Sequence, residues 1–536
     1  MSVAVASANA HASGPQPALR SRVPDVPPTE GVPAATSTAF NPVTATAEAS
    51  SNPPSSDIPG TRTLLIEPRD PLLARDARPF SSEPGARAFT LPWPWPRTIA
   101  KTIRALIGSG AGTATTWTAE RRRAMAAMAV HGPLMVAKER AGAPWEMYVP
   151  APRDVVFHRD TESDGEPSKR LNTMILRPAW LQPNEGVTEP PAPSPASAGG
   201  RGAKAFGNVA RDEFGRHAVI EVTADVKPDT DVPAWWRLDD ARRWLAWPGE
   251  EDDARDHLPL SAESEQVKQG VRGLRGPLTD ARMHVSIEPG TQTHVEGALF
   301  TTESLAFPGG YVQAEIDDQV QATHMAMLVR LVSAPAARLP EVAAFGGERR
   351  ISRITDRSNG GELFPSWPEA GSPPAGWAHA RGLRLQLVTP AIFQFGWLPA
   401  WLADGTIPGL GGTKLHLELV GVAMDRRQAV SGWFSTRRNT ERDPRAPQPR
   451  FSTHEELNGG GPAATDYVVP SGSVYFFRLA AGSGPLTEEI WRRLWLAPVS
   501  DLEIARNQGF GLVLPGIWNT KTVENSADQV IQETTT

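Results

Sequence analysis

The first residues that could do chemistry are basic side chains on one predicted helix. Apolar residues recur with helical periodicity over residues 96–107 and define one face. The opposite face carries Arg97, Lys101 and Arg104, spaced four and three residues apart. No acidic residue lies between them to form ion pairs along the helix, so three like charges stay close together. Such a stripe suits phosphate binding, and an ordinary solvated helix face is the plainer interpretation.

A second pair of candidates lies in a β-hairpin predicted from residues 283–287 and 294–300. Arg282 and His284 alternate with apolar residues, so they should share one face while the apolar residues pack beneath them. A histidine beside an arginine could bind phosphate, or act as acid and electrostatic stabiliser in RNA cleavage. A strand histidine is usually structural, because acid–base catalysis needs a second titratable partner and the sequence shows none.

Two glycine-rich segments could bring their backbone close to a ligand. Gly509 and Gly511 precede a predicted strand, where their N–H groups could reach phosphate. The segment 346–350, Gly-Gly-Glu-Arg-Arg, adds the guanidinium groups of Arg349 and Arg350. A tight turn explains either segment equally well.

Motifs of established catalytic centres are missing from the sequence. There is no cysteine among the 536 residues, which excludes disulfides, thiolate metal sites and cysteine nucleophiles. The 11 histidines are scattered, and no His-Glu-x-x-His, Gly-x-Ser-x-Gly, Walker loop or paired-aspartate motif occurs. We therefore expect no catalytic residue, no metal site and no cofactor.

Composition limits the remaining function classes. The formal net charge is −6, so nucleic acid would have to bind a local patch. Eight of the 54 basic residues are lysine and 46 are arginine, the better bidentate phosphate ligand, although a GC-rich genome gives the same bias. No stretch approaches the roughly 20 apolar residues that span a bilayer, and no secretory signal opens the chain. The expectation is a cytoplasmic protein without membrane contact.

The pattern along the chain favours an α+β fold with long loops. Residues 1–60 are rich in Ala, Ser, Thr and Pro and predict a disordered extension, and loops of similar composition are expected over 183–204 and 435–465. Strands accompany isolated helices without strict βαβ alternation, and two ferredoxin-like units with insertions would fit. Strands are expected at 63–67, 134–138, 145–149, 171–176, 217–222, 283–287, 294–300, 324–332, 383–389, 414–422, 473–479 and 511–518, and helices at 96–107, 117–130, 239–246 and 488–496.

The order of several segments resembles the third subunit of the Cmr module, a RAMP-superfamily protein of type III-B CRISPR effectors. The resemblance starts with Ile66-Glu67-Pro68-Arg69-Asp70-Pro71-Leu72, Arg75-Asp76-Ala77-Arg78-Pro79-Phe80 and Pro96-Arg97-Thr98-Ile99-Ala100-Lys101-Thr102-Ile103-Arg104. It continues through 132–134, 149–154, 282–285, 296–300, 346–349, 389–393, 431–433, 470–475 and 509–511 in the expected order. It thus spans residues 60 to 519.

The resemblance implies two ferredoxin-like, RRM-related domains, over 61–310 and 311–536. It also implies a non-catalytic subunit that caps the 5′ end of a CRISPR RNA in antiviral defence. Such a subunit holds the repeat-derived tag, contacts the large polymerase-like subunit and abuts the adjacent backbone RAMP subunit. Arg97 and Lys101 depart from the family, which often has Ser and a small residue there, and they add positive charge.

We therefore predict a convergent RNA-binding site around the 5′ tag. Its residues are Arg69, Arg78, Arg97, Lys101, Arg104, Arg282, His284, Arg349, Arg350, Gly509 and Gly511. Two other functions stay open. One is a metal-independent RAMP endoribonuclease that processes repeat RNA, with His284 or His131 as acid or base. The other is a protein–protein scaffold without RNA contact, which docks through the tryptophans of 235–247.

Overall fold

Antiparallel strands form most of the described chain. The computed structural model describes residues 60–518 apart from 79, 81–84, 110–117, 139, 141, 161–167, 169, 179–219, 222–225, 250–253, 262–268, 289, 310–323, 358–363, 432, 435–460, 463–464 and 481–482. The chain divides into two units, Met1–Pro54 and Ser55–Thr536, and all described residues belong to the second. The extension predicted over 1–60 lies outside the described residues except for Gly60, as do most of the predicted loops 183–204 and 435–465.

The largest sheet has seven antiparallel strands. Their order is β13 (Val342–Phe345), β14 (Arg350–Asp356), β1 (Gly60–Pro68), β12 (His324–Ala334), β3 (Ala129–Lys138), β4 (Glu146–Pro150) and β9 (Trp235–Arg237). Strand β1 lies between β12 and β14, so the sheet joins strands from before and after residue 310. The domain boundary predicted at that residue therefore falls between two strands and does not separate two sheets.

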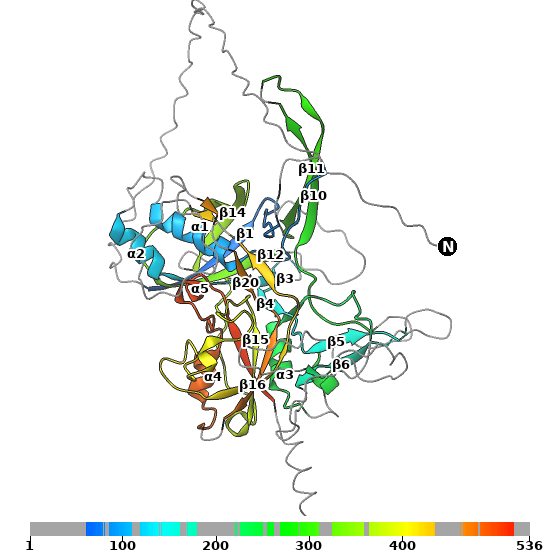
Figure 1. The fold of residues 1–536 in the computed structure, drawn as a ribbon, viewed down its shortest axis with the longest axis vertical. Coiled ribbons are helices and arrows are strands. Elements are labelled where there is room, and N and C mark those ends of the chain that lie inside the picture. Colours follow the sequence, from blue (N-terminus) through cyan, green and yellow to red (C-terminus); the bar gives the residue numbers. More distant parts are fainter. Residues whose placement is uncertain are drawn as a thin grey trace, which may run out of the picture. The chain divides into compact units, whose positions relative to one another are not determined.

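Helix α1 (Pro96–Ser109) packs on one face of this sheet. Ile99 and Ile103 are fully buried in a cluster with apolar residues of β1, β3 and β12, as the helical spacing predicts. Helix α2 (Ala119–Ala127) contacts α1, and Figure 1 shows both in blue, beside each other. The helix predicted over 117–130 is too long at its C-terminal end, because Val130 already pairs with β12 in the sheet.

The opposite face of the large sheet packs on a second, four-stranded sheet. Its order is β16 (Leu417–Ala423), β21 (Val474–Leu479), β15 (Gly382–Leu387) and β22 (Val513–Trp518). Leu134 and Leu328 of the large sheet share one buried cluster with Leu385 and Phe477 of the second. Helices α3 (Leu238–Ala246) and α4 (Glu488–Leu494) border this core, since both contact β22.

A buried ion pair links the second sheet to the segment that follows β4. Arg384 of β15 lies 3.3 Å from Asp154, and both side chains are almost fully buried. Burial raises the pKa of Asp154, and the nearby Arg384 charge opposes this shift. Arg384 also donates to the carbonyl oxygens of Trp244 at 2.7 Å and Trp247 at 2.8 Å. These bonds satisfy a charge that would otherwise be costly to bury.

A long hairpin extends beyond the two sheets. It consists of β10 (Leu278–Ile287) and β11 (His294–Ala306), and the short β2 (Arg87–Ala88) runs parallel to β11. Figure 1 shows the hairpin in green. The remaining pairs are β17 (Gln428–Val430) with β20 (Asp466–Val468), β5 (Val155–His158) with β6 (Asn172–Ile175), β7 (Arg177–Pro178) with β8 (Ile220–Glu221) and β18 (Trp433–Phe434) with β19 (Gly461–Pro462).

The α+β class expected from the sequence is confirmed. The described helices are few and short, including α5 (Glu503–Arg506), and the sheets are almost entirely antiparallel. Among the described residues, no helix has the length and apolar character needed to cross a membrane.

Candidate nucleic-acid interface

The basic face of α1 contacts the chain itself. Arg97 forms an ion pair with Asp466 of β20 at 2.5 Å and donates to Gln508 at 3.1 Å. Its guanidinium lies 5.7 Å from the ring centre of Phe510, and the side chain is only 14% exposed. The helix itself holds no acid, as expected, but the face is not free at Arg97, because an acid reaches it from a strand 369 residues away in sequence.

Arg104 and Lys101 lie on the same face of α1. Arg104 donates to the carbonyl oxygens of Met128 at 2.7 Å and Asn507 at 2.8 Å, and burial lowers its pKa. Burial also lowers the pKa of Lys101, and the charge of Arg97 adds to this effect. Arg104 thus fastens α1 to the segment that contains the glycine-rich motif.

The glycine-rich segment 507–511 packs against β3. Gly509 has φ +89°, and a Cβ there would lie 2.6 Å from the carbonyl oxygens of both Val130 and Gly132. Gly511 has φ +85°, and its Cβ would lie 2.6 Å from the Ser500 hydroxyl. Both glycines are buried. The close approach that requires glycine here is thus an internal one, whereas the prediction placed open backbone beside RNA.

We call this region the joint: the polar face of α1, the start of β3 and segment 507–511. It connects the large sheet to β20 and to the strand that follows the glycines. Thr389 strengthens it, since its hydroxyl donates to the Gly509 carbonyl at 2.7 Å and accepts from the Leu512 N–H at 2.9 Å. Four of the five predicted site residues in the joint, Arg97, Arg104, Gly509 and Gly511, are turned inward.

A second group of predicted residues lies at the turn between β13 and β14. The N–H of Arg69 donates to the Ile351 carbonyl at 2.9 Å, so Arg69 borders this turn. Arg349 is exposed and left-handed, with φ 52°. Arg350 pairs with Glu348 at 2.5 Å. The turn therefore presents Arg349 to solvent, while Arg350 is already engaged.

The third group combines arginines with aromatic rings at the base of the hairpin. The Arg75 guanidinium lies 4.9 Å from the ring centre of Phe80, and that of Arg78 lies 4.4 Å from the ring of Phe89. Arg87 lies 4.9 Å from the same Phe89 ring. All three arginine residues are exposed, although Arg78 also pairs with Asp76 and Arg87 with Glu303.

The hairpin itself completes this group. His284 of β10 stacks on Phe300 of β11, with 5.1 Å between ring centres and an angle of 14° between planes. The His284 Nε2 lies 2.8 Å from the Thr302 hydroxyl, and Phe80 meets Phe300 edge-on at 5.8 Å. Arg282 pairs with Asp280 at 2.7 Å. We call Arg75, Arg78, Arg87, Phe80, Phe89, His284 and Phe300 the arginine–aromatic cluster.

The other face of the hairpin contradicts the prediction that its apolar residues pack beneath. Met283 is 73% exposed, Ile287 53% and Leu299 50%, and Val285 and Val295 are exposed as well. The alternation of faces is as predicted, since Arg282 and His284 pair across the strands with Thr302 and Phe300. What the sequence could not show is that no described element covers this part of the hairpin.

The predicted residues thus fall into separate groups. Segment 69–78 links the β13–β14 turn to the cluster, because Leu72 bonds β11 through the Leu305 carbonyl at 2.8 Å and Leu73 accepts from Gly347 at 3.0 Å. It therefore brings together Arg69, Arg78, Arg282, His284, Arg349 and Arg350. The joint holds Arg97, Lys101, Arg104, Gly509 and Gly511. The two groups meet through the core, because the Leu91 N–H donates to the Ala74 carbonyl at 2.7 Å and Leu91 shares a buried cluster with Phe510.

The aromatic half of the cluster was missed from the sequence. Phe80 and Phe89 lie in irregular segments, and Phe300 was counted only as part of a strand. The available signal was the density of arginine around these rings, Arg75-Asp76-Ala77-Arg78-Pro79-Phe80 and Arg87-Ala88-Phe89. A pattern of this kind is typical of cation–π pairs and of stacking surfaces.

The two histidines considered for catalysis sit in different surroundings. Burial lowers the pKa of His131 to about 4, and the charge of Arg330 opposite it in the sheet adds to this effect. His131 is therefore neutral at pH 7 and lacks the acidic imidazolium proton that a general acid would donate there. His284 contacts a hydroxyl and a phenyl ring. Among the described residues, no group of three or more potential ligands could hold a metal ion.

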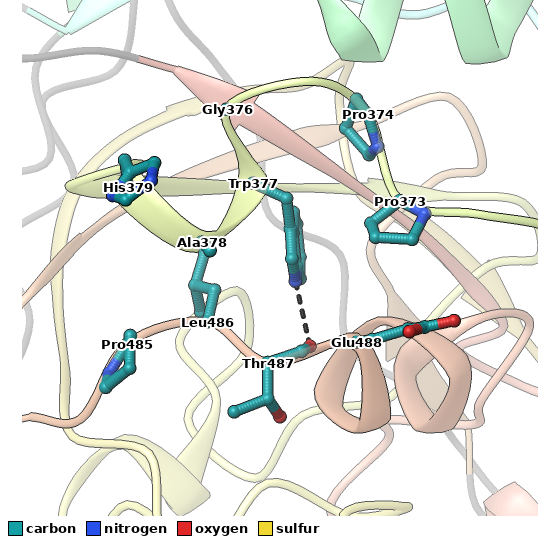
Figure 2. Close-up of a pocket in the computed structure, with 10 residues that line it drawn as sticks. All are labelled: Pro373, Pro374, Gly376, Trp377, Ala378, His379, Pro485, Leu486, Thr487 and Glu488. Carbon is teal, nitrogen blue, oxygen red and sulfur yellow. Dashed lines mark hydrogen bonds between the residues drawn. The ribbon is translucent and has the colours of Figure 1, made fainter.

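A pocket of about 400 Å³ lies away from these groups (Figure 2). It is lined mainly by prolines, Leu486 and Trp377, with His379 and Glu488 as its charged or titratable residues. Trp377 donates from its indole nitrogen to the Thr487 carbonyl at 2.9 Å, the bond dashed in Figure 2. None of the predicted site residues lines this pocket.

Comparison with known proteins identifies the family. Residues 64–518 match the family model described as CRISPR-associated protein (Cas_Cmr3). This match covers most of the chain and confirms the resemblance seen in the segments above. No curated protein matches the chain.

Solved structures give a more distant likeness. A cryo-EM structure of the type III-B Cmr-beta bound to cognate target RNA and AMPPnP has 11% sequence identity, with a TM-score of 0.32. A second, bound to cognate target RNA, has 12% identity and a TM-score of 0.33. Each match covers 77% of this chain and 86% of the other. The family assignment therefore rests on the family model.

Proposed function

Because the chain belongs to the Cas_Cmr3 family of CRISPR-associated proteins, we propose that it is a non-catalytic RNA-binding subunit of a type III-B Cmr effector complex. In this proposal it acts in the cytoplasm, caps the 5′ tag of the CRISPR RNA and contacts the large polymerase-like subunit and the adjacent backbone RAMP subunit. Two ferredoxin-like, RRM-related domains belong to the same proposal. The observation that carries it is the arginine–aromatic cluster.

The cluster has the two features that single-stranded RNA requires. Guanidinium groups bind phosphate oxygens in bidentate geometry, and aromatic rings stack on bases. Arg75 and Arg78 keep their charges at the surface while they lie over phenyl rings. The stacked His284 and Phe300 extend the aromatic surface onto the hairpin. Because the whole chain carries a net charge of −6, this local concentration of arginine is needed for RNA to approach.

The joint has a supporting role in this proposal. Arg97 and Arg104 donate hydrogen bonds to Gln508 and to the Asn507 carbonyl, so they hold the glycine-rich segment against β3. Lys101 is the exposed member of the stripe, and on that ground we assign it to RNA. The tag therefore lies, in this proposal, between the cluster and Lys101 of α1.

The apolar face of the hairpin suits a protein partner. Exposed contiguous apolar surface on a monomer usually marks an interaction site. Met283 and Ile287 are more than half exposed on β10, and Leu299 is half exposed on the paired β11. We assign this face to one of the two neighbouring subunits. Replacing Met283 and Ile287 by serine should reduce incorporation into the effector complex and leave RNA binding by the isolated chain unchanged.

RNA binding is tested with the full chain and fluorescently labelled tag RNA over a salt series. Arg75→Gln with Arg78→Gln should weaken binding several-fold and reduce the slope of log affinity against log salt by up to about 1.4, since each phosphate contact contributes about 0.7. The control is Arg492→Gln with Arg493→Gln on α4, where both arginines pair with glutamates. Equal affinity and slope in both variants and the wild type would contradict the proposal and favour the scaffold function.

The absence of catalysis is tested separately. The chain is incubated with its repeat RNA, with and without divalent ions, beside His284→Ala and His131→Ala. We expect intact RNA in every sample. Site-specific cleavage that either substitution abolishes would establish the processing endoribonuclease instead.

A further inference from the structure

Helix α2 carries three consecutive arginines that the predicted site does not include. They are Arg121, Arg122 and Arg123, and the one acidic residue of the helix is Glu120 in its first turn. Met125 is the one buried residue among those described in the helix, and the rest of its surface is polar or alanine. A nine-residue helix of this kind gains little from packing, so its arginines are not there to hold a core.

The surroundings of these arginines differ from those of the paired arginines elsewhere on the surface. Arg122 and Arg123 are exposed, and none of the three side chains has an ion pair with a described residue. Two other exposed arginines have acidic partners: Arg78 pairs with Asp76 and Arg282 with Asp280. The unbalanced charge on α2 is therefore local, in a chain whose net charge is negative.

Helix α4 provides a direct comparison. It has two consecutive arginines, Arg492 and Arg493, and each pairs with a glutamate four residues earlier, at 2.6 and 2.7 Å. Its apolar face is buried. The sequence of α4 thus neutralises its own arginines, whereas α2 has no acid at that spacing. Positive charges without acidic neighbours attract a polyanion, so a polyanion is the partner that this surface suits.

We propose that α2 is a phosphate-binding surface for single-stranded RNA that continues from the tag. The inference rests on the proposed function, and it assigns the RNA beyond the tag to a second surface. Successive arginines point about 100° apart around a helix, so Arg122 and Arg123 can reach neighbouring phosphates of one strand. The contact is with phosphate groups and therefore does not depend on base sequence. Helix α1, with Lys101, lies against α2 and connects the two surfaces.

The test compares two RNA probes with the full chain. One is the tag alone, and the other is the tag extended by a uridine tract. The variant is Arg122→Gln with Arg123→Gln, which keeps helix propensity nearly constant. Arg492→Gln with Arg493→Gln removes the same charge from α4, and Arg122→Lys with Arg123→Lys keeps the charge on α2.

We expect the glutamine variant to bind the extended RNA several-fold more weakly, with a salt slope smaller by up to about 1.4, and to bind the tag alone as the wild type does. The lysine variant should recover most of the slope, and the α4 variant should match the wild type. Unchanged binding of the extended RNA, or an equal loss in the α4 variant, would overturn the assignment. So would reduced incorporation into the complex with unchanged RNA binding, which would make α2 a protein contact. If the wild type fails to bind the tag alone, the proposed function itself fails.

Discussion

The joint and the arginine–aromatic cluster use the same side chain in opposite ways. In the joint, Arg97 and Arg104 project from α1 and are bound to Asp466, Gln508 and backbone carbonyls. In the cluster, Arg75 and Arg78 lie over phenyl rings and remain exposed. Helical spacing predicted that the arginines of the joint are exposed. It did not predict the arginines of the cluster, which lie outside helices. An arginine pattern therefore predicts the face on which charges lie, and the tertiary neighbours decide whether they are still available.

The largest effect is expected for Gly509→Ala in the joint. The new Cβ would lie 2.6 Å from two carbonyl oxygens at φ +89°, so we expect a loss of about 4 kcal/mol in the free energy of unfolding. Urea denaturation measures it. Gly412→Ala is the matched control, because Gly412 has φ +88° and no atom within 4 Å of the new Cβ. That variant should lose about 1 kcal/mol, and equal losses would show that backbone strain alone explains the joint.

Acid should weaken the joint through His131. Its pKa is about 4 in the folded chain and about 6.5 when unfolded, so the unfolded chain binds more protons between these values. The contribution of His131 to stability therefore falls as the pH drops from about 6.5 to about 4, by at most about 3 kcal/mol, and this contribution changes no further below that. His131→Gln removes this contribution. The difference between wild type and variant in urea denaturation, measured across this range, should follow that curve, and a constant difference would exclude His131 as the cause.

The pair of Arg97 and Asp466 should show a measurable coupling. Its arginine is largely buried, so a double-mutant cycle with Arg97→Gln and Asp466→Asn should give about 1–2 kcal/mol in unfolding free energy. The exposed pair of Arg492 and Glu488 should give less than about 0.5 kcal/mol. Equal coupling energies for the two pairs would mean that the Arg97–Asp466 pair holds α1 no more firmly than an exposed ion pair would. Because both arginines are bound to the chain, we also expect that reversing the charges of Arg97 and Arg104 unfolds the joint. The same change on an exposed stripe would leave the fold intact.

The cluster should respond in RNA affinity and little in stability. Phe300→Leu removes a stacking surface that contributes about 1 kcal/mol or more per base, so tag RNA should bind at least about five-fold more weakly. Phe300→Tyr keeps the ring and should bind as the wild type does. Fluorescence anisotropy measures both, and thermal unfolding checks the fold. If the Phe300→Leu variant binds tag RNA as tightly as the wild type does, no base stacks on Phe300.

Local structure was largely predictable from the sequence. The periodicity of 96–107 gave α1 to within two residues, and alternation gave the two faces of the hairpin correctly. The hydrophobic pattern could not show what covers each face. Asp466 and Gln508 reach Arg97 from hundreds of residues away, and Phe300 meets Phe80 across a comparable separation. Those contacts depend on the order of strands in the sheets, which periodicity does not encode.

The most direct test of the central claim is photo-crosslinking of the CRISPR RNA in the native effector complex, followed by mass spectrometry of this chain. Tag nucleotides carrying a photoreactive uridine should crosslink to Phe80, Phe89, Phe300 or His284, the residues whose rings form the cluster. Crosslinks confined to segment 507–511 and to α1, with none at the base of the hairpin, would contradict the account and place the tag at the joint.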